Sequence, residues 1–91
     1  MANIHVHRNH TLGLEGARSE VEKIAEQLKQ QMQANYRWQG DRLLFERSGA
    51  DGTIDVGESD VDVKLDLGLL LSPMKGMIQK QIEEYLDARF R

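Results

Sequence analysis

The stretch VDVKLDL, residues 61–67, decides the fold class of this chain. Apolar and charged side chains alternate along it without a break: Val61, Val63, Leu65 and Leu67 on one side, and Asp62, Lys64 and Asp66 on the other. A period of two predicts a β-strand with one buried face and one wet face. Strands of this kind form sheets that are covered on one side only, so we expect a mainly antiparallel sheet.

Two shorter segments show the same alternation. Residues 3–8 place Ile4 and Val6 on one face and polar side chains on the other. Further along, SGADG at residues 48–52 predicts a turn, and TIDVG at residues 53–57 predicts a short strand. Both strands are therefore expected to join the sheet with one face toward the core.

A hairpin is predicted between these segments, in NYRWQGDRLLFER at residues 35–47. Gly40 and Asp41 suit the positive dihedral angles of a two-residue turn. The register that follows from this turn puts four large side chains on one face of the sheet: Tyr36, Trp38, Leu43 and Phe45.

Apolar residues recur at helical spacing in two segments. The first segment starts at Leu14 and is expected to stop at Asn35, because asparagine tolerates the left-handed conformation of helix ends. The second segment starts at Ser72 and Pro73, a serine that can cap a helix and a proline favoured in its first turn. The two stripes are Leu14, Ala17, Val21, Ile24, Ala25, Leu28 and Met32, and Met74, Met77, Ile78, Ile82, Tyr85, Leu86 and Phe90.

The predicted order is β-α-β-β-β-β-α, an α+β fold. We expect a two-layer sandwich in which a mainly antiparallel five-stranded sheet carries both helices on one face. The length of 91 residues fits one domain over residues 1–91. The first connection runs through a helix, so the first strand is placed beside the last strand.

Composition excludes several classes of protein. The chain has no cysteine, which excludes disulfides and thiolate metal sites and fits a reducing compartment. A net charge of −3 without a basic run argues against nucleic-acid binding. Because no transmembrane segment or signal peptide is recognisable, we expect a cytoplasmic protein.

Three histidines lie close together in IHVHRNH at residues 4–10. His5 and His7 share one face of the predicted strand, where Asp62 or Asp66 of an adjacent strand could complete a metal site. The simpler interpretation is a polar solvent face, and we assign no metal and no cofactor. His10 follows the strand and is expected to make local contacts.

The string LGLLLSP, residues 67–73, is the most apolar part of the chain. One interpretation is an interaction patch. The other, which we favour, is a core plug between the last strand and the last helix, because a small domain needs most of its leucines inside. The candidate apolar contact region consists of Leu69, Leu70, Leu71, Met74 and Met77.

No catalytic motif is recognisable. The sequence has no nucleophile elbow and no phosphate-binding glycine loop, and its four serines stand in no catalytic setting. The acidic turn DGTIDVGESD, residues 51–60, departs from the spacing of a calcium loop. We therefore assign no catalytic residue and expect a protein that is not an enzyme.

Three strings together resemble one small bacterial family. They are HTLGLEGAR at 10–18, YRWQGDRLLFERSGADGTIDVG at 36–57 and LGLLLSPMKGMIQKQIEEYLD at 67–87. The chain is similar to the putative polyhydroxyalkanoic acid system proteins, a family named for a genomic setting near polyester storage. The resemblance implies a cytoplasmic accessory protein of polyhydroxyalkanoate storage, and it brings no catalytic residue.

Two functions of different classes remain open. One is a non-enzymatic interaction protein whose partner is the polyhydroxyalkanoate granule or a granule-associated protein. The alternative is a binding protein for a small hydrophobic ligand, an acyl chain or hydroxyacid held between sheet and helix in a reduced helix-grip arrangement. A homodimer is a further possibility, formed through an unpaired strand edge at the hairpin or through LGLLL.

Overall fold

The computed structural model describes residues 2–90, except for the side chains of residues 2, 31 and 32. Met32, expected to end the first apolar stripe, is thus outside the described side chains. The elements are β1 (Ala2–Asn9), α1 (Gly13–Met32), β2 (Asn35–Gln39), β3 (Arg42–Arg47), β4 (Ala50–Val56), β5 (Asp60–Leu67), the short 3₁₀ helix η1 (Ser72–Met74) and α2 (Lys75–Arg89). This confirms the predicted order and the α+β class.

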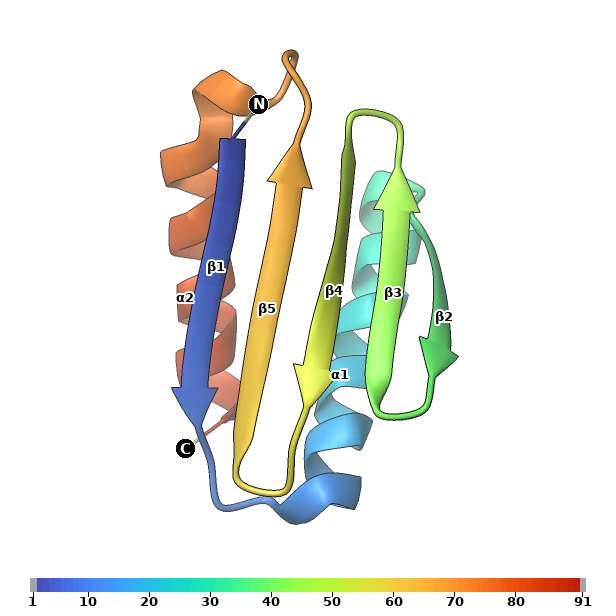
Figure 1. Cartoon of the computed structure of the whole chain (residues 1–91), viewed down its shortest axis with the longest axis vertical. Coiled ribbons are helices and arrows are strands. Elements are labelled where there is room, and N and C mark those ends of the chain that lie inside the picture. The colour runs from blue at the N-terminus through green and yellow to red at the C-terminus, as the bar shows by residue number, and fades with distance from the viewer. Residues whose placement is uncertain (1, 91) are drawn as a thin grey trace.

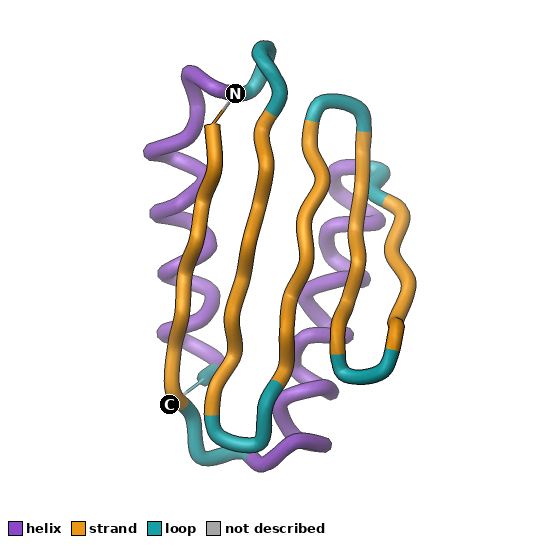
Figure 2. The backbone as a smooth tube through the Cα atoms, in the orientation of Figure 1, coloured by secondary structure: helices purple, strands orange, loops and turns teal. Residues whose placement is uncertain are grey.

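The five strands form one sheet in the order β1-β5-β4-β3-β2. Every neighbouring pair is antiparallel, as Figures 1 and 2 show. The first strand lies beside the last, as predicted, and Ile4 pairs with Leu65 while Val6 pairs with Val63. Since β1 and β2 are the two outer strands, the hairpin side of the sheet is an open edge.

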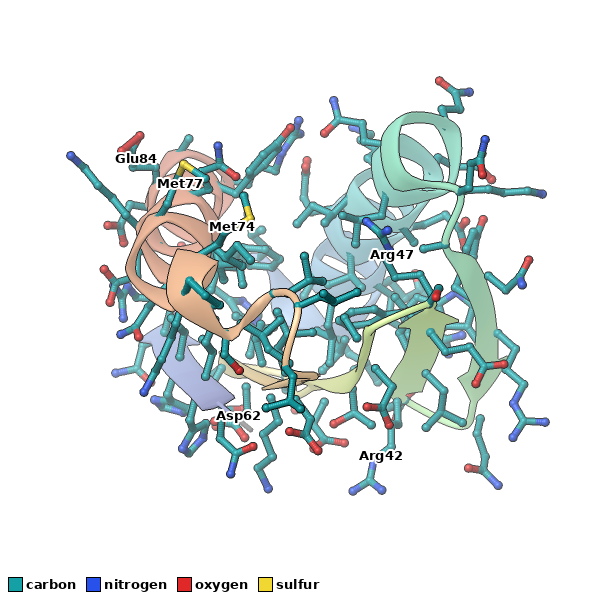
Figure 3. All side chains as sticks on the ribbon, turned by 90° about the horizontal axis from the view of Figure 1, so that it is seen from above. Arg42, Arg47, Asp62, Met74, Met77 and Glu84 are labelled. Carbon is teal, nitrogen blue, oxygen red and sulfur yellow. The ribbon has the colours of Figure 1, made fainter. Side chains whose placement is uncertain are left out.

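Both helices cover the same face of the sheet. In Figure 1, α2 lies behind β1 and β5, and α1 lies behind β4 and β3. Figure 3 shows Arg42 and Asp62 on the opposite face, pointing away from the helices. Alternation along each strand therefore separates an apolar layer from a charged surface. The largest fully buried side chains are Ile4, Val21, Leu43, Val61, Leu67 and Leu86.

The strand β4 is longer than the sequence indicated. It starts at Ala50, so the prediction of a turn over residues 48–52 is wrong. The observed turn consists of Ser48 and Gly49 only. The physical reason is Gly52, which pairs with Phe45 across the sheet. A Cβ at Gly52 would collide with the Lys64 carbonyl oxygen of β5 and would lie only 2.8 Å from the Phe45 ring of β3. The glycine therefore makes room for both neighbouring strands and stays in β4.

The first helix ends earlier than predicted. Gln33, not Asn35, adopts the left-handed conformation, with φ of 56°. The next residue, Ala34, is buried, and Asn35 already opens β2. Burial of Ala34 sets the position of the turn and overrides the local preference of asparagine.

The start of the second helix also differs from the prediction. The chain first forms η1, which contains Pro73, and α2 begins at Lys75. Ser72 does not cap a helix, because its hydroxyl donates to the carbonyl oxygen of Gly68 at 2.9 Å. The serine thus closes the preceding turn.

Candidate functional site

The turn after β5 carries two strongly exposed leucines. Leu69 is 81% exposed and Leu70 is 89% exposed. The turn is tight because the backbone N–H groups of Leu71 and Ser72 both donate to the carbonyl oxygen of Gly68, at 3.1 and 3.0 Å. Gly68 is itself tied to the neighbouring turn, since its N–H donates to the Gly49 carbonyl oxygen at 2.8 Å. The two leucines therefore stand at the tip of an anchored turn.

The core interpretation of LGLLLSP is wrong for these two leucines. It holds for Leu71, which is half-buried and packs against the core. Met74 and Met77, at the start of the last helix, are 41% and 52% exposed. We call the four exposed residues the apolar patch: Leu69, Leu70, Met74 and Met77. The candidate apolar contact region predicted from the sequence therefore contains one core residue, Leu71, and four surface residues.

An apolar groove separates the two helices. Its volume is about 170 Å³. Ile54 and Val63 of the sheet form part of its floor. Ile24 of α1 and Ile78 and Ile82 of α2 contribute to its walls. The groove is smaller than most sites for drug-sized ligands, and its mainly apolar lining suits a small hydrophobic ligand.

Polar contacts between the helices close one end of the groove. The Tyr85 hydroxyl donates to Oε1 of Gln27 at 2.6 Å. One turn further, Nη1 of Arg89 donates to Oε2 of Glu20 at 3.1 Å. These contacts hold α1 and α2 together at the end remote from η1, so the groove opens on the side of η1 and the β3–β4 turn.

Arg47 lies at the open end of the groove. Strand alternation puts its side chain on the same face as Leu43 and Phe45. Its Nε donates to the neighbouring Ser48 carbonyl oxygen at 3.2 Å. Figure 3, which looks down from this end, shows Arg47 on the side of α1 and Met74 on the side of α2.

Arg47 is the one charged residue among the described groove residues, and no described carboxylate forms an ion pair with it. Sequence reasoning missed this arginine. The available signal was its position in β3, where alternation assigns a charged side chain to the inner face.

A hydrogen-bonded cluster holds α1 to β2. Tyr36 donates its hydroxyl to Glu22 and to Glu26, the latter at 2.5 Å. The indole Nε1 of Trp38 donates to Oε1 of Glu22 at 2.8 Å, and the Arg18 guanidinium lies 4.4 Å from the Trp38 ring centre. The hydrogen bonds from Tyr36 and Trp38 hold the pKa of Glu22 below its ordinary 4.5, and Arg18 adds to the effect. The same carboxylates raise the pKa of Tyr36.

The histidines form separate pairs. Nε2 of His5 lies 2.6 Å from Oδ1 of Asp62, and Nε2 of His7 lies 3.0 Å from Oδ2 of Asp60. Asp66, the other predicted partner, faces Asn3 across the strands. Within residues 2–90, no group of three or more histidine, aspartate or glutamate side chains has a geometry that could hold a metal ion.

His10 has a different environment, because it is only 4% exposed. Its Nδ1 accepts a hydrogen bond from the Leu12 backbone N–H at 3.1 Å. Nε2 must then carry the proton, which it directs to the carbonyl oxygens of Gly57 and Asp60, both at 3.1 Å. Its ring also lies 5.5 Å from that of Phe90. His10 joins the end of β1, the β4–β5 turn and the end of α2.

Neither helix in the described part of the chain has an apolar stretch of the length that crossing a bilayer requires. Neither a curated protein nor a solved structure matches the chain at a significant level. A family model does match, and it covers residues 4–90, which include both helices and nearly the whole sheet. The chain belongs to the family described as putative polyhydroxyalkanoic acid system protein.

Proposed function

We propose that this protein is a non-enzymatic accessory protein of polyhydroxyalkanoate storage, which contacts the granule surface or a granule-associated protein through the apolar patch. Family membership supports the link to the storage system. The observation that carries the contact is the exposure of Leu69 and Leu70, at 81% and 89%. Because storage granules lie in the cytoplasm, the proposal includes a cytoplasmic location.

The chemistry of the patch suits an apolar, irregular partner. Burying one leucine or methionine side chain contributes roughly 1.5 to 3 kcal/mol. Flexible methionines adapt to surfaces without a fixed shape, as an amorphous aliphatic polyester presents. This gain has to offset the cost of association, so we expect a weak, reversible attachment.

The two groups with shifted pKa values, Glu22 and Tyr36, lie in the contact between α1 and β2. Glu22 and Tyr36 hydrogen-bond each other, and both serve to hold α1 on β2. Their shifts therefore have a structural cause and need no reaction to explain them.

The test is the location of fluorescent fusions in polymer-accumulating cells. We expect the wild-type fusion on granules and the Leu69→Ser/Leu70→Ser variant diffuse in the cytoplasm. The matched control is Leu12→Ser, an exposed leucine directly before α1. In Figure 1, α1 begins at the end of the molecule opposite to the connection between β5 and α2. A diffuse wild-type fusion, or a double variant that stays on granules, contradicts the proposal.

A second experiment separates the two partners. Purified protein is mixed with polyester particles that carry no protein, and bound protein is measured after sedimentation. Binding that the Leu69→Ser/Leu70→Ser variant loses identifies the polymer surface as the partner. Binding only to native granules identifies a granule-associated protein instead.

A further inference from the structure

We propose that the groove between α1 and α2 binds an aliphatic carboxylate of roughly six to eight carbons, with its chain between the helices and its carboxylate on Arg47. This site lies beside the apolar patch but does not depend on it. The proposal therefore goes beyond granule contact and stands on the groove residues alone.

The size of the groove sets the length of the chain. An apolar protein cavity of about 150 Å³ accommodates one benzene molecule. The groove, at about 170 Å³, has room for a similar number of carbon atoms or slightly more. Tyr85 and Gln27, which hydrogen-bond each other at 2.6 Å, join the two helices within the groove lining, so we expect a longer chain to extend past the mouth.

The lining sets the polarity of the ligand. Isoleucines from three elements, Ile24, Ile54 and Ile82, line the groove and offer nothing to a polar group. The polar side chains of the lining are Gln27 and Tyr85, which hydrogen-bond each other, Gln81, and Arg47. Arg47 is the charged one, and its guanidinium has no carboxylate partner among the described residues. A planar guanidinium beside an apolar cavity binds a carboxylate through two parallel hydrogen bonds. Charge complementarity thus favours an acid over a neutral lipid or an amine.

The position of Arg47 leaves its guanidinium available. It is half-buried at the end of β3, and its Nε donates a hydrogen bond to the Ser48 carbonyl oxygen. The two terminal nitrogens can therefore face a ligand. On the same strand, Arg42 points to the opposite face and pairs with Asp55 at 2.5 Å, which makes it a matched control.

The experiment is a titration of hexanoate into the purified protein, followed by NMR of the isoleucine methyl groups. We expect saturable shifts at Ile24, Ile78 and Ile82, binding at least tenfold weaker in Arg47→Gln, and unchanged binding in Arg42→Gln. Methyl hexanoate, which keeps the chain and lacks the charge, should bind wild type and Arg47→Gln equally weakly. Affinity should rise from butanoate to hexanoate and level off beyond octanoate.

Three outcomes overturn the proposal. The first is that hexanoate shows no saturable binding. The second is that wild type and Arg47→Gln bind hexanoate equally. The third is that hexanoate changes NMR shifts only on the charged face of the sheet. A second copy of the chain could occupy the groove instead, and sedimentation over a range of protein concentrations tests for such a dimer. A dimer that shifts the same methyl groups and excludes hexanoate also overturns the proposal.

The two proposals fail separately. The Leu69→Ser/Leu70→Ser variant should keep hexanoate binding, because neither leucine lines the groove. The Arg47→Gln variant should keep its location on granules.

Discussion

The two helices cover the same face of one sheet, yet they are attached in different ways. Three residues of α1 are almost completely buried, namely Ala17, Val21 and Ala25. In α2 only Leu86 is buried, and Met77 near its start is 52% exposed. α1 is therefore buried over its middle turns, and α2 is anchored near its C-terminal end.

The difference has its origin in side-chain size and polar contacts. Small side chains at Ala17 and Ala25 let the backbone of α1 approach the sheet, and the cluster around Glu22 fixes this helix to β2. α2 instead rests on the larger Ile78 and Ile82, which are only partly buried and line the groove. Apolar surface that α1 uses for stability is left accessible along α2.

The strongest test of this comparison is Leu86→Ala. Removing the one buried side chain of α2 should lower the free energy of unfolding by about 3 kcal/mol, through lost burial and a new cavity. Urea denaturation measures the change. Met77→Ala on the same helix is the control, with an expected change below about 0.5 kcal/mol. If both variants lose the same amount, α2 is not anchored at one end.

The next test concerns His10, which ties β1 and the β4–β5 turn to the end of α2. His10→Ala leaves the Leu12 N–H without its imidazole acceptor and removes the contact with Phe90. We expect a loss of about 2 kcal/mol in the free energy of unfolding. The exposed pair of His5 with Asp62 gives the control, because His5→Ala should cost less than about 0.5 kcal/mol. Equal losses would show that the buried ring has no special role.

The smallest expected effect is that of Glu22→Gln. Because the pKa of Glu22 is lowered in the folded state, its contribution to stability is complete above about pH 4.5. It disappears as the pH falls through the lowered folded value. Replacing the carboxylate weakens the hydrogen bonds from Tyr36 and Trp38, so Glu22→Gln should cost about 1 kcal/mol at pH 7.

Unfolding curves between pH 2 and pH 7 provide the measurement for Glu22→Gln. The stability of the variant should fall less steeply than that of the wild type on acidification. Glu46→Gln, an exposed position in β3, is expected to keep the wild-type slope. A Glu22→Gln profile parallel to the wild type would contradict the role assigned to the cluster.

Alternation made most of the fold predictable. A strict period of two in residues 61–67 and in β1 identified the inner face of the sheet, and the helical connection after β1 indicated its place beside β5. Boundaries that depend on contacts between distant residues were wrong. Gly52 stays in β4 because a Cβ there would collide with Lys64 of β5 and with the Phe45 ring of β3, and α1 ends just before the buried Ala34.

The candidate site was predictable only in part. The sequence identified the leucines and methionines near residue 70. It did not show which of them are buried, because a short apolar string looks the same in a core and on a surface. The exposure of Leu69 and Leu70 follows from the tie between Gly68 and Gly49, two turns that are distant in sequence. Arg47 belongs to a groove formed by both helices, and no local pattern shows how far apart two helices stand.

The position of β1 at the edge, paired only with β5, has a consequence for the order of folding. Asn9 pairs with Asp60, 51 positions later, and Ala2 pairs with Leu67, 65 positions later. After Asn9, another 58 residues must be synthesised before β5 is complete at Leu67. At a synthesis rate of about 5 to 20 residues per second, β1 waits roughly 3 to 12 s for its partner strand to be complete. During that time the hairpins β2–β3 and β3–β4 can form from neighbouring segments. We therefore expect the N-terminal strand to join the sheet last, in a slow, long-range step.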